Sequence, residues 1–357
     1  MKQPIPLLIH SRLAADIPQD RKDLPIRDVG TTYSMAQEVR WLDHDHFAIG
    51  RWDGSMTVFN HDPARADAPL ISAALVAPSL AGVEMIARIR PELFASSNDG
   101  QSIVIWQADG SFSEDGIRVL RTLQYGPAIG PANDGAVTEC GDVTYFVSGH
   151  ASGFALIWQV RDDNNFELIG QVDLRSADPI PSPYGLKNIR GVEAWRPGYV
   201  ATGSEDGDLC LVKIPEGHIV ARCRYNASAQ RGINDIDVCG DYLLVANCSV
   251  GEGDKNLWLF SIQDSGFTFL DAHNLKINTE LNQVFNFCVD QGKVDGTQYF
   301  FSATQEGVVW VGMVEDNALR PLGSQKVSTN SGAALSYAPA SRLLAVAGDN
   351  LHLFEVQ

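Results

Sequence analysis

The sequence predicts an all-β fold, a single seven-bladed β-propeller built from four-stranded antiparallel blades. Three observations predict it. A hairpin pattern recurs along the chain, further strand-like runs flank each copy, and the first residues can supply a strand that the last copy lacks. A repeat period of about 40–55 residues is typical of propellers and related repeat architectures. The repeat therefore decides the fold before any single motif is interpreted.

The first hairpin is the stretch FAIGRWDGSMTVFN, in which Asp53-Gly54 separates two alternating apolar runs. Glycine tolerates the positive φ of a tight turn, and an aspartate accepts hydrogen bonds from nearby backbone N–H groups. We expect the same turn-forming role for Asp99 and Asp206. The seven hairpins cover residues 47–60, 93–107, 145–160, 199–214, 242–262, 299–314 and 343–356, and their second strands close on Phe59, Trp106, Trp158, Val212, Phe260, Gly312 and Phe354.

Each hairpin is preceded by one strand-like run, and the first six are followed by another. Four short strands per repeat, joined by turns, make a propeller blade. The preceding runs are residues 36–42, 83–89, 135–140, 189–195, 233–239, 282–288 and 332–338, and the following runs are 69–76, 117–125, 166–174, 218–225, 266–272 and 318–327. The predicted blades are 36–76, 83–125, 135–174, 189–225, 232–272, 282–327 and 331–357, the last completed by 5–13.

The N-terminal run IPLLIHSRL, residues 5–13, alternates in the manner of a strand and has no other partner. The seventh repeat lacks a fourth strand. Pairing the two would leave no blade incomplete, and an incomplete blade exposes an edge strand that promotes aggregation. We therefore expect the N-terminal strand to complete the last blade.

The repeat resembles WD40-type propellers, most closely in NDGQSIVIWQ and SEDGDLCLVKI. In that family the Trp-Asp pair ends the second strand of the hairpin. Trp106-Gln107 and Trp158-Gln159 match that position here, whereas Trp52-Asp53 falls in a turn and is coincidental. A Gly-His pair, usual ahead of each WD-repeat blade, is absent from those positions. The resemblance implies a seven-bladed propeller and a role as a scaffold.

Composition restricts the partners. The chain carries a formal net charge of −17 without a run of Lys or Arg. Because nucleic-acid affinity depends on cationic contacts to phosphate, we expect no nucleic-acid partner. The charge either keeps the protein soluble or attracts a basic protein partner. The six cysteines lack metal-ligand spacing and read as buried thiols of a reducing compartment. With neither a signal peptide nor a long apolar segment, we expect a cytoplasmic protein without membrane contact.

Catalytic motifs such as GxSxG, HExxH and GxxxxGK[ST] are absent, and no cofactor is expected. Asp43-His44-Asp45-His46 is dense in possible metal ligands but falls in a predicted turn without completing partners. Some propeller enzymes instead hold a metal in the central channel with carboxylates from several blades. The candidates for such a site are Glu38, Glu84, Glu139, Glu193 and Asp235.

A protein partner is expected on the face that carries the hairpin turns and the connectors between blades. Long connectors at 14–35, 126–134, 175–188 and 273–281 lie there, and long loops are often functional. Trp and Arg are enriched in interface hot spots. The predicted contact residues are Tyr33, Arg51, Trp52 and His150, together with a cationic patch of Tyr184, Arg190, Arg196 and Arg231.

The sequence thus predicts a non-catalytic scaffold or adaptor subunit, a monomeric propeller within a hetero-complex. Two alternatives remain open. One is a channel-centred hydrolase or lactonase that uses a metal held by carboxylates from several blades. The other is a sensor that holds a small ligand in the channel. Fold alone does not decide among them, because propellers host many functions.

Overall fold

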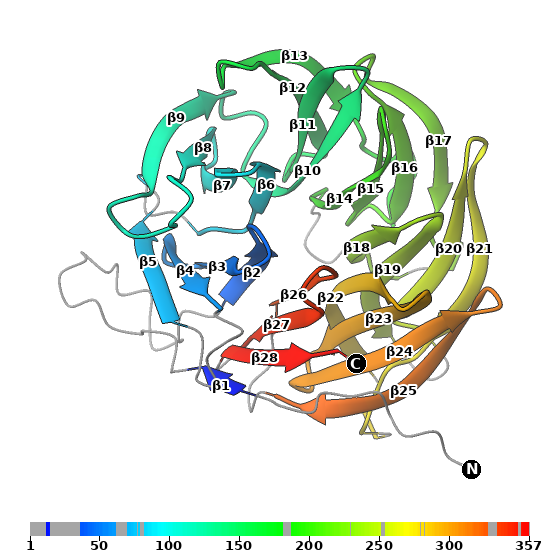
Figure 1. Cartoon of the computed structure of the whole chain (residues 1–357). Coiled ribbons are helices and arrows are strands. Elements are labelled where there is room, and N and C mark those ends of the chain that lie inside the picture. The colour runs from blue at the N-terminus through cyan, green and yellow to red at the C-terminus, as the bar shows by residue number, and fades with distance from the viewer. Residues whose placement is uncertain are drawn as a thin grey trace.

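The structure is a computed structural model of the 357-residue chain. It describes residues 12–14, 36–61, 70–76, 78, 82–180, 187–228, 230–250, 254–278, 280–281, 283–327, 334–348 and 351–356. The described chain forms small antiparallel sheets arranged as a ring around a central channel (Figure 1). The fold is therefore an all-β propeller of four-stranded antiparallel blades, as the sequence predicts.

Five sheets have four strands each. In four of them the strands follow one another in sequence order from the channel outward, and in the fifth the N-terminal strand forms the outer edge. Their strands are β2 (Ala36–Trp41), β3 (His46–Arg51), β4 (Ser55–Asn60) and β5 (Leu70–Val76); β6 (Ile86–Arg90), β7 (Leu93–Asp99), β8 (Ser102–Gln107) and β9 (Arg118–Gln124); β10 (Ala132–Cys140), β11 (Val143–His150), β12 (Phe154–Val160) and β13 (Phe166–Asp173); β14 (Ile189–Arg196), β15 (Tyr199–Ser204), β16 (Asp208–Lys213) and β17 (His218–Arg224); and β26 (Ala334–Ala338), β27 (Leu343–Ala347), β28 (Leu351–Glu355) and β1 (Arg12–Ala14).

The remaining strands form one eight-stranded sheet, because β19 pairs with β22 in addition to its neighbours β18 and β20. That extra pairing is short and joins Cys248–Val250 to Gln283–Phe285. The strands are β18 (Ile233–Cys239), β19 (Tyr242–Val250), β20 (Leu257–Gln263), β21 (Gly266–His273), β22 (Gln283–Val294), β23 (Thr297–Thr304), β24 (Val308–Glu315) and β25 (Ala318–Lys326). The described sheets are thus five separate blades and one larger, continuous sheet.

The first hairpin turn forms as the sequence predicts. Gly54 adopts φ of 80°, and its N–H donates to the Arg51 carbonyl oxygen. The Asp53 carboxylate accepts hydrogen bonds from the Ser55 N–H at 2.9 Å and from the Ser55 hydroxyl at 2.6 Å. Trp52-Asp53 therefore belongs to the turn and not to the end of a strand. Asp206 differs, because its carboxylate accepts from the Ser176 N–H of the preceding connector instead of from its own turn.

A β-bulge recurs at one position of the outer hairpins. The bulge occurs in four of the four-stranded sheets and in both four-strand groups of the eight-stranded sheet. In each, the register between the third and fourth strands shifts directly before the closing residue identified in the sequence. A bulge increases the local twist, which lets each outer strand bend around the rim of the ring. The six shifts precede Phe59, Trp106, Trp158, Val212, Phe260 and Gly312.

The core lies between the faces of neighbouring sheets and not in the channel. Apolar side chains of one sheet pack on those of the next; for example, Val58 of β4 and Phe94 of β7 belong to one buried cluster. The first and last sheets pack in the same way, and the Trp41 indole N–H donates to the Ser336 carbonyl oxygen at 2.9 Å. The ring is therefore closed by side chains as well as by strand pairing.

The N-terminal strand completes the last sheet, as expected. β1 pairs antiparallel with β28, and Leu13 lies opposite His352. The paired residues are 12–14, whereas the sequence predicts 5–13; residues 5–11 lie outside the described part.

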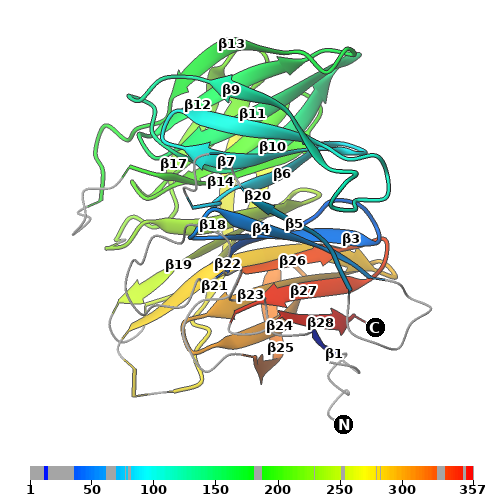
Figure 2. The same cartoon turned by 90° about the vertical axis from the view of Figure 1, so that its left-hand side faces the viewer.

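The inner strand of the third blade also differs from the prediction, because it begins at Ala132 and not at 135. The edge-on view in Figure 2 shows the strands crossing from one face of the ring to the other.

Candidate functional site

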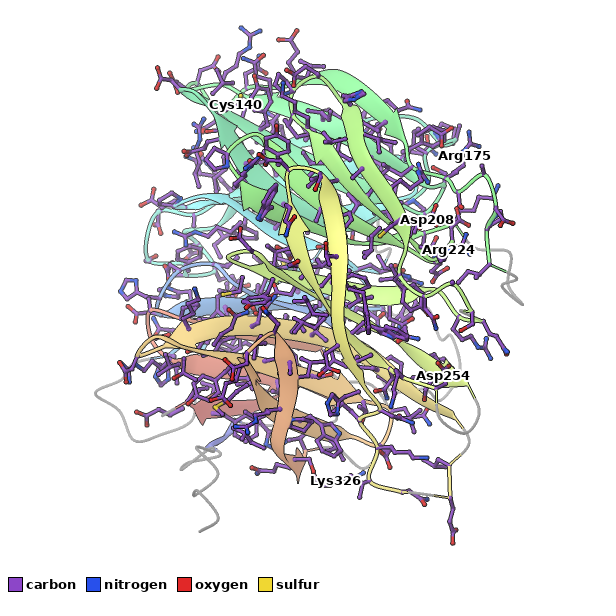
Figure 3. All side chains as sticks on the ribbon, turned by 90° about the vertical axis from the view of Figure 1, so that its right-hand side faces the viewer. Cys140, Arg175, Asp208, Arg224, Asp254 and Lys326 are labelled. Carbon is purple, nitrogen blue, oxygen red and sulfur yellow. The ribbon has the colours of Figure 1, made fainter. Side chains whose placement is uncertain are left out.

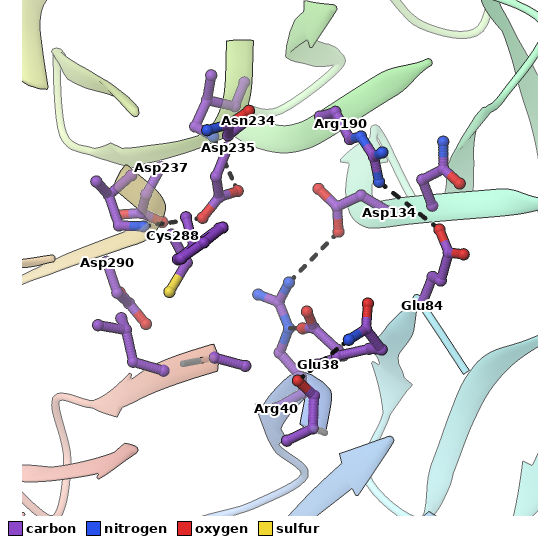
Figure 4. A pocket seen from close by; sticks show the side chains of 18 of the residues that line it. Glu38, Arg40, Glu84, Asp134, Arg190, Asn234, Asp235, Asp237, Cys288 and Asp290 are labelled. Carbon is purple, nitrogen blue, oxygen red and sulfur yellow. Dashed lines mark hydrogen bonds and ion pairs between the residues drawn. The ribbon is translucent and has the colours of Figure 1, made fainter. Parts of the chain in front are cut away.

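The mouth of the channel contains a cavity of about 530 Å³. Its lining comes from the inner strands β2, β10, β14, β18, β22 and β26, from the segment before β6, and from two hairpin turns (Figure 4). Of the described residues, eight carboxyl side chains and two arginines line it: Glu38, Glu84, Asp134, Glu193, Glu205, Asp235, Asp237 and Asp290, with Arg40 and Arg190. This is a strongly acidic site by residue type.

Several of these carboxylates bind the open edges of neighbouring inner strands. The Asp134 Oδ2 accepts from the Val192 N–H at 2.6 Å, which links β10 to β14. In the same way, Asp290 Oδ2 accepts from the Tyr337 N–H at 2.6 Å and links β22 to β26. An inner strand has no further strand on its channel side, so its N–H groups need other acceptors. The carboxylates supply them and stabilise the channel wall.

Arg40 is the cation at the centre of the lining. It reaches Glu38 at 3.3 Å, Asp134 at 3.4 Å and Glu193 at 3.7 Å, and its Nε donates to the Ile86 carbonyl oxygen. These partners come from β2, β10 and β14 and from the segment at β6. A single guanidinium therefore ties together four neighbouring segments across the channel.

Arg190 forms a second, smaller network at the same mouth. Its Nε lies 2.8 Å from Glu205 Oε1, and its Nη1 lies 3.7 Å from Glu84 Oε2. Glu205 belongs to the turn between β15 and β16, so this pair links a hairpin turn to the channel wall. The two arginines together meet five of the eight carboxyl groups.

Burial changes the titration of the channel carboxyls. It raises the pKa of Glu38 to about 8 against the opposing effect of Arg40, and the negative charges of Asp134 and Glu193 raise it further. The pKa of Glu193 is likewise raised by burial to about 8, and that of Asp290 to about 6. Burial raises the pKa of Asp235 well above its ordinary range. The lining is therefore only partly ionised at neutral pH.

The structure brings together four of the five channel carboxylates predicted from the sequence: Glu38, Glu84, Glu193 and Asp235 all line the cavity. Glu139 does not, because it is exposed near the far end of β10. The prediction for Glu139 is wrong because the strand begins earlier than expected. Sequence reasoning missed Arg40 and the carboxyl groups of Asp134, Glu205, Asp237 and Asp290.

The metal-dependent alternative needs at least three ligands that converge. Among the residues that the structure describes, no group of three His, Cys, Asp or Glu side chains could hold a metal ion. The Asp43 carboxylate accepts instead from the Asp45 and His46 N–H groups at 2.8 and 2.7 Å, as a turn residue does.

Two of the predicted contact residues are buried. Arg51 is 4% exposed and donates to the Ser55 and Thr57 hydroxyls, at 3.1 and 2.9 Å. His150 is fully buried, with Nε2 2.9 Å from the Ser148 hydroxyl and Nδ1 3.1 Å from the Gly130 carbonyl oxygen. Each is the last residue of its strand and points into the blade, so both predictions of a surface contact are wrong.

Trp52 is exposed at the edge of the cavity. Its side chain is 54% exposed and lines the cavity, and its ring lies against Gly82, where an added Cβ would be 3.4 Å from the indole. The turn that carries Trp52 belongs to the same face as the turn that carries Glu205. The channel mouth therefore opens on the face of the hairpin turns, beside an exposed indole.

The predicted cationic patch is not one patch. Arg190 and Arg196 lie near opposite ends of β14, about 20 Å apart along the strand. Arg196 stacks on the rings of Trp195 and Tyr199 at 4.2 and 4.5 Å on the other face of the ring. Arg231 precedes β18 and lies near the hairpin-turn end of that strand. Tyr33 and Tyr184 lie outside the described residues.

The hairpin-turn face is held together by charged contacts to a connector. The Asp208 carboxylate binds Arg222 and Arg224, each at 3.0 Å, and Arg222 also donates to the Leu174 carbonyl oxygen. Figure 3 shows Asp208 and Arg224 on the opposite face from Cys140, which ends β10. The start of the 175–188 connector is therefore fixed to its neighbouring blade.

Comparisons with known proteins address the fold. No family model matches the sequence, and no curated protein matches it. Among the described residues, no helix is long and apolar enough to cross a membrane. Solved structures do match, at 12–13% identity.

Three matching structures are WD40-type propeller proteins. The β-propeller domain of Myceliophteria thermophila Cps50 (Swd1) has a TM-score of 0.64 at 13% identity, covering 92% of this chain and 99% of that one. The WD40 β-propeller domain of Doa1 has 0.66 at 12%, covering 98% of both. U3-55K has 0.67 at 13%, covering 92% and 97%. At such identities the likeness shows the fold alone, and the chain has the fold of WD40 β-propeller domains.

Proposed function

We propose that this protein is a non-catalytic scaffold or adaptor subunit that binds a protein partner on the hairpin-turn face, around the channel mouth. The observation that carries the proposal is Trp52, a large aromatic residue that is 54% exposed beside the acidic cavity. Exposed tryptophans next to pockets are favoured as interface anchors. The WD40 fold, which often serves in assemblies, agrees with this role.

The ring is inferred to have seven blades. Seven inner segments, at β2, β6, β10, β14, β18, β22 and β26, are followed by strands in the same order, and the β19–β22 pairing joins two four-stranded groups. The blade boundaries proposed from the sequence fit this count. A closed ring has no deep cleft other than its channel, so its loops and channel mouth are the surfaces available to a partner.

The partner is proposed to be basic, because the net charge is −17 and the channel mouth is lined by carboxyls. Electrostatic complementarity of this kind accelerates association and excludes acidic competitors. The same charge disfavours nucleic acid, since phosphate would be repelled. We also propose that the protein is cytoplasmic and acts as a monomeric propeller within a hetero-complex.

Affinity purification from the native host, with quantitative mass spectrometry, tests the proposal. Wild type is compared with Trp52→Ala and with Phe269→Ala, a matched control because Phe269 is 52% exposed on the outer strand β21. We expect one stoichiometric partner retained by wild type and Phe269→Ala and depleted at least tenfold with Trp52→Ala. Identical recovery by all three proteins, or the absence of any stoichiometric partner, would contradict the proposal.

A further inference from the structure

The cavity at the channel mouth is electrostatically one-sided. Arg40 and Arg190 lie on the side formed by β2, β10 and β14 (Figure 4). On the other side, β18 and β22 contribute Asp235, Asp237 and Asp290. Among the described residues, no Lys or Arg lies within salt-bridge distance of these three carboxyls, although the charge of Arg40 partly offsets the rise in pKa that burial causes at Asp237 and Asp290. Figure 4 shows these three side chains grouped together and apart from the two arginines.

The three aspartates are not equally satisfied. Asp235 Oδ2 accepts from the Val289 N–H at 2.9 Å, and Asp290 accepts from the Tyr337 and Gln291 N–H groups. Asp237 Oδ2 is shielded from solvent and accepts no hydrogen bond from a described residue. A shielded carboxyl oxygen without a donor is costly. A ligand that donates a hydrogen bond to Asp237 Oδ2 would therefore be stabilised.

Aromatic side chains complete this side of the cavity. Phe285 and Phe287 follow one another on the same face of β22 and line the cavity, and both remain partly exposed. Their rings are 6.0 Å apart and nearly parallel, at 8°. The faces of such rings attract cations and cover alkyl chains. The combination of carboxyl groups and aromatic rings favours an organic cation over an inorganic ion.

We propose that this side of the channel mouth binds an organic cation, a guanidinium or alkylammonium group. Its charge is met by Asp235, Asp237 and Asp290, and its carbon atoms contact Phe285 and Phe287. The cavity volume of about 530 Å³ lies within the range of small-molecule sites, roughly 300–1,000 Å³. The cation is either a free polyamine or the side chain of an arginine or lysine from another protein. The site does not depend on the proposed scaffold role.

The charges around the site couple binding to pH. Burial raises the pKa of Asp290 to about 6, and burial raises the pKa of Asp235 and Asp237 well above their ordinary range. A bound cation stabilises their ionised forms, so binding should release protons and strengthen as pH rises from 6 to 8.5. The other charged groups that face these aspartates are Glu38, Arg40, Asp134 and Glu193.

Isothermal titration calorimetry of the full chain tests the proposal. The probes are spermidine, the blocked peptide acetyl-Gly-Arg-Gly-amide and the same peptide with neutral citrulline in place of arginine. Titrations in 150 mM NaCl screen the general attraction of the acidic protein for cations. We expect saturable binding of spermidine or of the arginine peptide, and at least tenfold weaker binding of the citrulline peptide.

Two variants separate the site from general charge. Asp237→Asn should weaken binding about tenfold, the cost of losing one charged hydrogen bond. Glu139→Gln removes the same charge outside the cavity and should change affinity less than about twofold. If thermal denaturation shows that Asp237→Asn is unfolded, Asp235→Asn takes its place, because an asparagine oxygen can still accept from Val289.

The outcomes are decisive. Tighter binding of spermidine identifies a free polyamine as the ligand, and tighter binding of the arginine peptide identifies a protein side chain; either result supports the site. The proposal is overturned if neither probe saturates at millimolar concentration. It is also overturned if the citrulline peptide binds as well, or if Glu139→Gln weakens binding as much as Asp237→Asn. None of these results depends on finding a protein partner.

Discussion

Removing Arg40 should destabilise the fold in a pH-dependent way. Arg40→Met keeps a side chain of similar length but leaves Glu38, Asp134 and Glu193 facing one another without a cation. Each pair, at 3.3–3.7 Å, has a gross attraction of about 4–5 kcal/mol at an effective dielectric constant of 20. Desolvation offsets most of this attraction, and removing one partner of a buried pair costs about 3–5 kcal/mol in total.

The low end of that range applies here, because the Arg40 side chain is 30% exposed. We therefore expect Arg40→Met to lower the free energy of unfolding by about 3 kcal/mol at pH 9.5, where Glu38 and Glu193 are ionised in wild type. At pH 5 the loss should fall to about 1 kcal/mol. The reason is that the pKa values of Glu38 and Glu193, each about 8 with Arg40 present, leave these two groups neutral at pH 5. Without Arg40 both pKa values rise further, so the ion pairs contribute mainly above pH 8.

Urea denaturation of wild type and variant at both pH values measures this difference. Arg161→Met is the matched control, because Arg161 pairs with Glu167 at the surface with both side chains about half exposed. Such surface pairs contribute about 0–1 kcal/mol. A loss at pH 9.5 no larger than that of the control, or an equal loss at pH 5 and pH 9.5, would refute Arg40 as the cation that holds the channel wall.

Glu193→Gln should raise the free energy of unfolding by about 1–2 kcal/mol at pH 8.5 and leave it unchanged at pH 4.5. The reason is that the raised pKa of Glu193 makes wild type lose stability as pH rises from about 4.5 through 8. Urea denaturation across this range would contradict the prediction if the difference between the two proteins did not change with pH. Burial lowers the pKa of His150 to about 4, so its ring resonance in NMR should not titrate between pH 5 and 8. The contribution of His150 to stability should be lost as pH falls from about 6.5 to 4. An NMR titration midpoint near pH 6.5 would contradict this prediction. Deleting residues 1–14 removes β1 and leaves β28 as an open edge. We therefore expect a melting temperature lower by at least about 4 °C and light scattering that increases with protein concentration. A monomer as stable as wild type would show that the strand is dispensable.

The outer part of each blade could be predicted from sequence in detail. The closing residues of the hairpins coincide with the positions where the register shifts, as at Trp158 and Phe260. Alternation of apolar and polar residues determines which side chains face the neighbouring blade, and a hairpin turn limits the register to one choice. Local sequence therefore contains the information for these strands.

The ends of the strands were predicted less well, and this explains the wrong site residues. Arg51 and His150 are predicted as contact residues on the hairpin-turn face, but each is the final residue of a strand and points into its blade. Asp134 was assigned to a connector, although the inner strand β10 already begins at Ala132. Because side chains alternate between the two faces of a strand, an error of one residue at a strand end exchanges a surface position for a buried one.

The acidity of the channel follows from how the inner strands are joined. Bulges near the starts of β10 and β18 interrupt the regular pairing, and the open inner edges leave N–H groups such as those of Val192 and Val289 facing the channel. A side-chain acceptor must satisfy them, and Asp134 and Asp235 do so. Carboxylates placed for this structural reason accumulate around one narrow axis, where their mutual repulsion favours protonation or a cation. Arg40 supplies that cation on one side only, so the remaining side retains an attraction for positive charge that arises from the architecture itself.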